Sequence, residues 1–187
     1  MSWHRKRIKL GACTVGALTA ALFAVSTTPA AASGTYSGLA YVYGTGAYTN
    51  DWGDEGILSR GTHASSNATC LWQKILWADG NLGSLSDVDG VFGTQTYNAT
   101  RAWQQFETER HGAGLAIDGS VGKETFAWAN RNFYQTSGST GPGQTLWLWY
   151  DGYIHDFQLK RDPDGNYQFE DRNFAWRKAG YNYQSCS

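Results

Sequence analysis

The sequence predicts an α+β fold, in which a small three-helix bundle is followed by a C-terminal antiparallel β-sheet packed on or beside it. In residues 67–133 apolar side chains recur every three to four positions, as in helices. In residues 145–187 apolar and aromatic side chains alternate or form short blocks, as in strands. The pattern Asp-Gly-x-(Phe/Val)-Gly-x-x-Thr begins at Asp89 and again 29 residues later at Asp118, each time ahead of a predicted helix.

Residues 1–32 are predicted to be an export signal. Four basic residues come first, an uncharged apolar stretch covers residues 10–25, and Ala30, Ala31 and Ala32 provide a small-residue cleavage site before Ser33. Cys13 lies near the start of this stretch, so most of the apolar residues follow it instead of preceding it, which argues against lipidation there. The alternative, a retained membrane anchor, is disfavoured because the stretch is short for a membrane span. We therefore expect a secreted chain with no membrane contact after cleavage.

The mature chain is expected to carry a net charge of about −5, because four of the 15 basic residues and none of the 16 acidic ones lie in residues 1–32. A chain without a basic stripe has little means of displacing counterions from phosphates, so no nucleic-acid partner is expected. Attraction to an anionic cell wall must likewise come from short-range contacts.

Cys70 and Cys186 are the cysteines that remain after cleavage of the signal. An even count in an oxidising compartment predicts one disulfide between them, with two free thiols as the alternative. Closing a loop of over a hundred residues is worth about 4–5 kcal/mol in the chain-entropy model. The bond would hold the C-terminal end against the middle of the chain.

Residues 33–66 are rich in Gly and Tyr and predict a short strand at 39–43 and otherwise loop, a composition that also suits a flexible lead-in. Residues 134–144, which include the sequence SGSTGPGQ, are predicted to be a linker. Beyond it, strands are expected at about 145–150, 153–161, 166–170 and 174–183. Asp151-Gly152 and Pro163-Asp164-Gly165-Asn166 interrupt the strand pattern, and the second of these has the chemistry of a tight turn.

Three helices are predicted within residues 67–133. The first is capped by Ser66 or Asn67 and ends near Gly80. The second begins at Gly93 or Thr94, and the third at Gly122 or Lys123. The second is expected to bury Thr96, Ala99, Thr100, Trp103 and Phe106, and the third Phe126, Trp128 and Ala129.

The doubled pattern is first of all a turn that leads into a helix. In each copy the Asp accepts backbone N–H groups, the first Gly permits unusual φ, the Phe or Val enters the core, the second Gly allows close backbone approach, and the Thr occupies the first helical turn. These positions are Asp89, Gly90, Phe92, Gly93 and Thr96 in the first copy, and Asp118, Gly119, Val121, Gly122 and Thr125 in the second. Two Asp-x-Asp-Gly segments lack the remaining ligands of a calcium loop, so neither a metal nor a cofactor is expected.

The residues around this pattern carry a family resemblance. They are Leu71-Trp72-Gln73, residues 89–96, Ala102-Trp103-Gln104, residues 114–122 and Thr125-Phe126. Together they resemble the bacterial peptidoglycan-binding domain 1 family, which implies a compact three-helix wall-binding module over residues 67–131, of a kind that commonly sits beside wall-cleaving domains. The chain departs from the family where nine residues, 105–113, separate Gln104 from Gly114. We expect a longer second helix or a bulged loop at 107–112.

Candidate ligand contacts lie on one face of the second helix, at Tyr97, Arg101, Gln104 and Thr108. Tyr97 aligns with Phe126 and so could instead belong to the core, and Arg101 could be a solvated charge. The helix starts at Gly93 and Gly122 could receive a stem-peptide carboxylate. An aromatic platform could be built from Trp77, Trp147, Trp149, Tyr150 and Trp176, although core packing accounts for most of them equally well.

These observations predict a secreted, non-catalytic protein that binds peptidoglycan through its glycan or its stem peptides. No catalytic set is recognised, because the mature histidines are only His63, His111 and His155, without metal-ligand spacing. One alternative is a wall hydrolase, or an accessory to one, that acts through the strand-rich tail and His155. Another is a secreted interaction protein in which the helices are a scaffold and the tail binds a partner.

Overall fold

The computed structural model describes residues 34–186, and the predicted export signal lies outside them. The helices are α1 (Asn67–Ala78), α2 (Thr94–His111) and α3 (Lys123–Asn130), with short 3-10 helices η1 (Tyr48–Asn50) and η2 (Leu85–Asp87). The strands are β1 (Phe133–Gly138), β2 (Leu146–Tyr150), β3 (Phe157–Arg161), β4 (Tyr167–Glu170) and β5 (Trp176–Lys178). Within the described range, no helix is long and apolar enough to cross a membrane.

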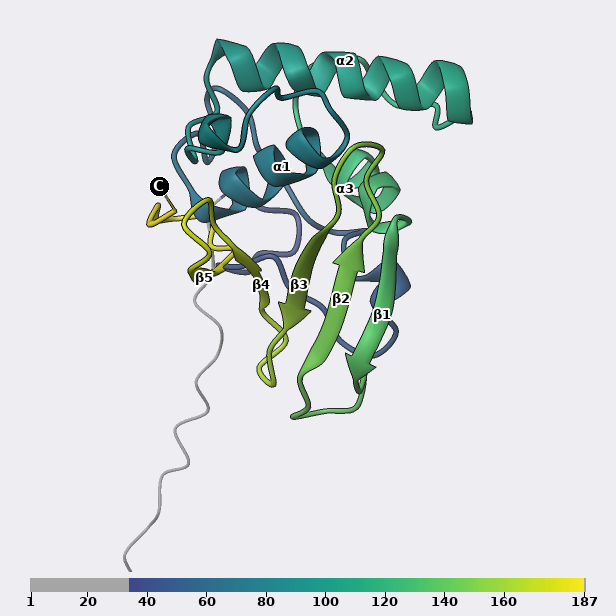
Figure 1. Cartoon of the computed structure of the whole chain (residues 1–187), viewed down its shortest axis with the longest axis vertical. Helices are drawn as coiled ribbons and strands as arrows, with labels where there is room; N and C mark the ends of the chain where they lie inside the picture. The colour runs from purple at the N-terminus through teal and green to yellow at the C-terminus, as the bar shows by residue number, and fades with distance from the viewer. Residues whose placement is uncertain (1–33, 187) are drawn as a thin grey trace, which may run out of the picture.

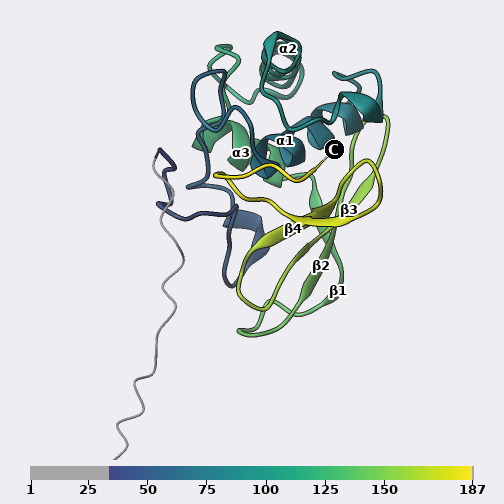
Figure 2. The same ribbon diagram turned by 90° about the vertical axis from the view of Figure 1, so that its left-hand side faces the viewer.

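The five strands form one antiparallel sheet in the order in which they occur along the chain, so each strand pairs with the next. The predicted α+β class is therefore confirmed (Figure 1). Helices α1 and α3 lie between α2 and the sheet in both Figure 1 and the view at right angles to it (Figure 2).

The prediction of a linker at 134–144 is wrong in its first half, because residues 134–138 belong to β1, which pairs with β2. Phe133 is buried, while the other five residues of the strand are exposed. The strand is thus held by its backbone pairing, one buried apolar side chain and a hydrogen bond from Thr136 Oγ1 to the Trp147 carbonyl (3.3 Å). Ser, Thr and Gly at an exposed edge give little signal in the sequence, since β-propensity reflects mainly side-chain packing.

The helices begin where the sequence places them. Ser66 caps α1 by accepting a hydrogen bond from the Thr69 backbone (3.0 Å), and α2 and α3 follow the N-cap residues Gly93 and Gly122. Helix α2 continues to His111, so residues 107–111 are helical and do not form a bulged loop. The prediction that Phe106 is buried is wrong, because it is 41% exposed.

In place of Phe106, the neighbouring Glu107 is buried on this part of α2. In α3 the apolar side chains Phe126 and Ala129 are buried as expected, while Trp128 is only partly covered.

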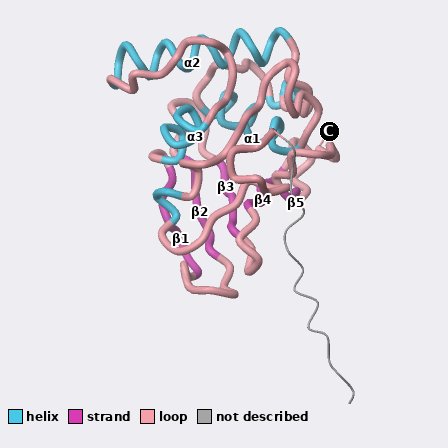
Figure 3. Tube along the Cα trace, turned by 180° about the vertical axis from the view of Figure 1, so that it is seen from behind, coloured by secondary structure: helices cyan, strands magenta, loops and turns pink. Residues whose placement is uncertain are grey.

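Residues 34–66 are part of the core, so a flexible lead-in is not what the structure has. Trp52 is fully buried, and its ring contacts Phe126 of α3, Phe133 of β1 and Tyr167 of β4 edge-on, with centroids 4.5–5.4 Å apart. The expected strand at 39–43 is reduced to isolated bridges at Tyr41 and Tyr43. In Figure 1 the purple and blue loops of this segment pass behind the sheet, and Figure 3 shows the molecule from that side.

Two buried acids fasten this segment to the C-terminal half of the chain. Asp51 accepts hydrogen bonds from the Arg161 guanidinium and the Tyr167 hydroxyl, both at 2.6 Å. Glu55 accepts from the Tyr181 hydroxyl at 2.5 Å and from the Tyr43 backbone at 2.9 Å. Burial raises the pKa of Glu55 to about 8, although both hydrogen bonds act in the opposite direction.

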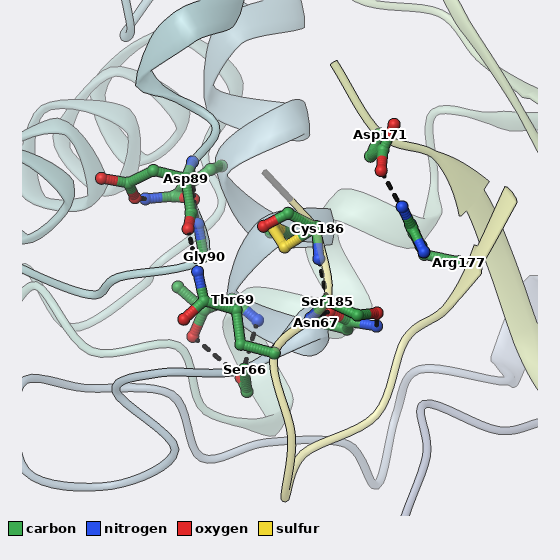
Figure 4. The surroundings of a disulfide bond; sticks show 12 residues. Ser66, Asn67, Thr69, Asp89, Gly90, Asp171, Arg177, Ser185 and Cys186 are labelled. Carbon is green, nitrogen blue, oxygen red and sulfur yellow. Dashed lines mark hydrogen bonds and ion pairs between the residues drawn. A yellow bond between two sulfur atoms is a disulfide. The ribbon is translucent and has the colours of Figure 1, made fainter. Parts of the chain in front are cut away.

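A disulfide joins Cys70 in α1 to Cys186, as predicted from the cysteine count (Figure 4). Asn67, one turn earlier on α1, holds the same tail through its side chain. Its Oδ1 accepts from the backbone of Ser185 (2.7 Å) and Cys186 (3.2 Å), and its Nδ2 donates to the Lys178 carbonyl (3.0 Å). The C-terminal segment is therefore attached to the start of α1 by a covalent bond and by several hydrogen bonds.

We predict that Glu55 makes the protein less stable as the pH rises from about 4.5 to about 8. The folded state holds the proton over this range and the unfolded state releases it, so the free energy of unfolding falls by roughly 3–5 kcal/mol across the window. Urea unfolding of the wild type and Glu55→Gln at about pH 4.5 and about pH 8.5 measures this. The variant should lose less stability over the interval, and an identical loss in both proteins would contradict the prediction.

Replacing both cysteines with alanine is expected to lower the free energy of unfolding by about 3–5 kcal/mol, because the bond closes a loop with a sequence separation of 116. Guanidinium unfolding under non-reducing conditions tests this, with intact mass used to confirm the oxidised state of the wild type. Two free thiols in the wild type, or equal midpoints for the two proteins, would contradict the account.

Candidate functional site

In the first copy of the repeated pattern, Gln73 of α1 binds the turn. Its Nε2 lies within hydrogen-bonding distance of Asp89 Oδ1 (2.8 Å), the Val91 carbonyl (3.1 Å) and Thr96 Oγ1 (2.9 Å). Its Oε1 accepts from the backbone N–H groups of Asp89 (3.0 Å) and Gly90 (2.7 Å). One glutamine thus joins α1 to the turn and to the start of α2.

The second copy repeats four of these five contacts with Gln104 of α2. Nε2 of Gln104 lies near Asp118 Oδ1 (3.2 Å), the Ser120 carbonyl (2.8 Å) and Thr125 Oγ1 (3.3 Å). Its Oε1 accepts from the Gly119 backbone (2.9 Å). Because four of the five contacts recur in the second copy, the repeat is a structural unit made of a helix glutamine, an Asp-Gly turn and a helix-start threonine.

The turns themselves have the local geometry that the sequence implies. Asp89 Oδ1 accepts from the Val91 backbone (2.9 Å) and Asp118 Oδ1 from the Ser120 backbone (2.8 Å). Gly119 has φ of +73° and faces the Tyr97 ring, where a Cβ atom would come within 2.5 Å. Phe92 and Val121, the apolar members of the two copies, are buried. The polar atoms of the pattern are therefore used in folding.

The predicted ligand face of α2 contacts the chain itself. Gln104 is 1% exposed and bound to the second turn. Arg101 Nε donates to the Ile117 carbonyl (3.3 Å), and Thr108 Oγ1 accepts from the Leu115 backbone (3.0 Å). Tyr97 packs on Gly119. All four predicted residues thus hold the loop at 112–121 against α2, which leaves this face occupied.

The N-cap residues of α2 and α3, Gly93 and Gly122, have no side chain that could accept a hydrogen bond from the first backbone N–H groups of the helix. The Asp side chains of the preceding turns bond within the turns, as described above. Binding of a stem-peptide carboxylate at these starts stays a prediction.

The five proposed platform aromatics fall into separate environments. Tyr150 is fully buried and donates to Asp79 Oδ2 (2.6 Å), so it belongs to the core. Trp147 and Trp176 meet edge-on at 5.5 Å on the outer side of the sheet. Trp77 is stacked on the His155 ring, with centroids 4.2 Å apart. Trp149 is half-buried and lines a hollow together with Lys74 and Trp77 of α1.

A pocket of about 230 Å³ opens where α2, α3 and the loop between β2 and β3 meet. Glu107 and His111 come from the last turns of α2, inside the nine residues by which the chain departs from the resembled family. Tyr153 comes from the β2–β3 loop. We call this the Glu107 pocket; its lining residues are Glu107, His111, Trp128, Arg131, Asn132 and Tyr153.

Hydrogen bonds and ring contacts fix the geometry of the Glu107 pocket. Trp128 Nε1 donates to Glu107 Oε2 (2.8 Å), and the Arg131 guanidinium lies 4.3 Å from the centroid of the Trp128 ring. The Tyr153 hydroxyl pairs with His111 Nε2 (2.9 Å). Phe106, exposed at the rim, contacts the Tyr153 ring at 5.2 Å.

The buried charge in this pocket is a carboxylate. Glu107 is 2% exposed; its Oε1 makes no hydrogen bond of good geometry among the described residues, although the Tyr153 hydroxyl lies close enough to interact with the carboxylate. Burial, and after it the negative charge of Glu107, raises the pKa of Tyr153 to about 12. A buried acceptor without a donor is costly. The pocket therefore suits a ligand that donates a hydrogen bond to Glu107 and packs on aromatic rings.

A second acid holds the loop that carries Tyr153. Asp79, just after α1, accepts from Trp103 Nε1 (2.7 Å) and from the Tyr153 backbone (3.2 Å), in addition to Tyr150. Burial raises the pKa of Asp79, although these hydrogen bonds lower it. Asp79 thus fixes the position of the loop from beneath the pocket.

Sequence reasoning missed the Glu107 pocket, although one signal was present. Glu107 lies four residues after Trp103, on the buried stripe of the same helix, and a carboxylate at such a position needs a specific reason. The three histidines lie apart: His63 Nδ1 pairs with the Tyr181 carbonyl (3.0 Å), while His111 and His155 contact Tyr153 and Trp77. Across residues 34–186 no group of His, Cys, Asp and Glu side chains could hold a metal ion.

Comparison of the chain with protein-family models gave no match. Comparisons with curated proteins and with solved structures also gave none.

Gln104→Ala is expected to lower the free energy of unfolding by about 2–4 kcal/mol, because it leaves several buried polar groups of the second turn without partners. Thermal or urea unfolding measures the effect. Gln105→Ala is the matched control: this neighbouring glutamine is exposed and bonds only Glu109 (2.8 Å), so its loss should cost within about 0.5 kcal/mol. Equal stability of the two variants would contradict a structural role for the repeat.

Proposed function

We propose that the protein is a secreted, non-catalytic peptidoglycan-binding protein, and that residues 67–131 form a three-helix wall-binding module. The observation that supports this best is the duplicated contact set of Gln73 and Gln104. These glutamines, the Asp-Gly turns and the threonines are the residues that carry the resemblance to the peptidoglycan-binding domain 1 family, and they act together in both copies.

The Glu107 pocket is the proposed contact with the wall. Peptidoglycan offers hydroxyl and ammonium groups that donate hydrogen bonds, carboxylates that suit Arg131, and sugar faces that pack on Trp128 and Tyr153. Small-molecule sites typically combine apolar walls with a few polar groups in a hollow, and this pocket has that composition. Contacts in this pocket are short-range and do not depend on the net charge of the protein. They could therefore bind an anionic wall even though the mature chain is expected to be acidic.

A wall hydrolase that acts through the tail is the competing function, with His155 as its key residue. His155 is exposed and its ring is stacked on Trp77. Nothing in its surroundings favours a catalytic role over this packing role, so hydrolysis enters only as an outcome of the binding experiment.

Binding is tested by sedimentation of the mature protein with insoluble peptidoglycan. Glu107→Gln should weaken binding about tenfold or more, because loss of a charge-assisted hydrogen bond is worth roughly 1.5–3 kcal/mol, while the glutamine oxygen can still accept from Trp128. Glu109→Gln, an exposed acid two residues along the same helix, should bind like the wild type.

The outcomes separate the hypotheses. Wild-type protein left wholly in the supernatant contradicts wall binding. If Glu107→Gln binds as well as the wild type, the role of the Glu107 pocket is contradicted, but wall binding by the protein is not. Release of soluble muropeptides by the purified protein, abolished by His155→Ala, would establish the hydrolase in its place.

A further inference from the structure

A second hollow, of about 220 Å³, lies between α1 and the sheet. Lys74 and Trp77 reach it from α1, Trp149 from β2, and Glu170 from the end of β4. We call it the Phe174 pocket and define it by Lys74, Trp77, Trp149, Asp156, Glu170 and Phe174. It shares no lining residue with the Glu107 pocket.

The turn at residues 171–175 exposes the Phe174 side chain to solvent. The side chain is 74% exposed, and the Phe174 φ of +61° lies in the left-handed region, which aromatic residues rarely adopt. The turn is fixed by Asp171, whose carbonyl accepts from the Phe174 backbone (3.0 Å) and whose Oδ1 accepts from the Ala175 backbone (3.0 Å). Arg177 Nε in turn pairs with Asp171 Oδ2 (2.7 Å).

A positive φ is unfavourable for phenylalanine, and burial of the Phe174 side chain does not offset this cost because the ring is mostly exposed. Residues kept in sparsely populated conformations by their surroundings are often found where a ligand is held. The strained backbone and the exposed ring are two observations that point to the same edge of the pocket.

The other aromatic side chains make walls beside Phe174. Trp77 and Trp149 are both half-buried, so each leaves part of its ring uncovered. His155 stacks on Trp77 at 4.2 Å, with the ring planes 11° apart, which restricts the Trp77 ring. The pocket thus has rigid aromatic faces on more than one side.

Polar groups lie among these rings. Lys74 is 5% exposed, its Nζ lies 5.3 Å from the centroid of the Phe157 ring, and it donates to the Glu170 carbonyl. An ammonium group has three N–H donors, so Lys74 can give further hydrogen bonds to a ligand in the pocket. The carboxylates of Asp156 and Glu170 provide acceptors. Burial also lowers the pKa of Lys74 to about 8.

We propose that the Phe174 pocket binds the glycan strand of peptidoglycan, with a sugar ring packed on Phe174, Trp77 and Trp149. Sugar rings have an apolar C–H face that packs on aromatic rings and a rim of hydroxyl and acetamido groups. Lys74 donates to a carbonyl or hydroxyl oxygen of the sugar, and Asp156 and Glu170 accept from its hydroxyl groups. The source of the glycan rests on the proposed function, but recognition of the sugar is a property of the pocket itself.

A saccharide fits these features better than a protein partner does. The hollow is small and concave, and several of its lining groups are charged, whereas the centres of protein interfaces are depleted in charge. Binding sites for small ligands combine aromatic walls with a few polar groups, as here.

The probe is a soluble N-acetylglucosamine tetramer, titrated into the full mature protein by calorimetry. The wild type should bind it, and Phe174→Gly should weaken binding at least tenfold. The same substitution should raise the midpoint of thermal unfolding by about 2–4 °C, because glycine adopts this φ without strain and little buried surface is lost. A higher midpoint together with lost binding is a result that a purely structural phenylalanine would not give.

Lys74→Met provides a second variant, which keeps the aromatic walls and removes the donors; it should also weaken binding at least tenfold. Tyr36→Ala is the matched control, since Tyr36 is a 56% exposed aromatic outside the pocket, and it should bind like the wild type. Wild-type affinity in Phe174→Gly, or equal losses in all three variants, would overturn the proposal.

Sedimentation of the same proteins with insoluble peptidoglycan distinguishes sugar recognition by the Phe174 pocket from wall binding by the whole protein. A wild type that binds the wall but not the tetramer contradicts glycan recognition and leaves wall binding in place. A wild type that binds the tetramer but not the wall supports the pocket and contradicts the proposed function. Failure to bind either contradicts both.

Discussion

Helix α1 is buried along nearly its whole length, and each polar side chain that it carries into the core needs a hydrogen-bond partner there. Asn67 finds its partners in the C-terminal tail, Gln73 in the first Asp-Gly turn, and Lys74 at the end of β4. Trp72 donates to Thr100 of α2 (2.9 Å). Burial of this one helix therefore brings together the tail, the turn, the second helix and the sheet, and the disulfide at Cys70 adds a covalent bond to the same arrangement.

Much of the helical part could be predicted because its signals are local. A capping serine before α1, a glycine before α2 and before α3, and a regular apolar stripe all act within a few residues, and the disulfide follows from the number of cysteines. The N-terminal segment could not be predicted in this way. Its anchors Asp51 and Glu55 depend on Arg161 and Tyr181, which lie 110 and 126 residues away. Strand β1 depends on backbone pairing with β2, and its Ser and Thr residues give no sequence signal for this pairing.

The candidate sites were harder to predict than the fold for a related reason. A repeated motif draws attention to its own residues, yet the polar atoms of Gln73, Gln104 and the two turns are used to build the helices. The two hollows take their residues from outside the repeat: Glu107 from the lengthened part of α2, and Tyr153 and Phe174 from turns of the C-terminal sheet. A hollow formed by segments so far apart in the chain leaves no spacing to recognise, although a buried acid and an exposed, strained aromatic mark each one in the structure.

The central claim is that the repeat builds the structure while the hollows beside it bind the wall. Amide chemical-shift changes of the isotope-labelled mature protein, recorded as soluble peptidoglycan fragments are added, test this most directly. The account predicts the largest changes around Glu107, Trp128 and Tyr153 and around Phe174, with little change in the turns at 89–93 and 118–122. Changes centred on those two turns and on the helix starts that follow them would contradict it.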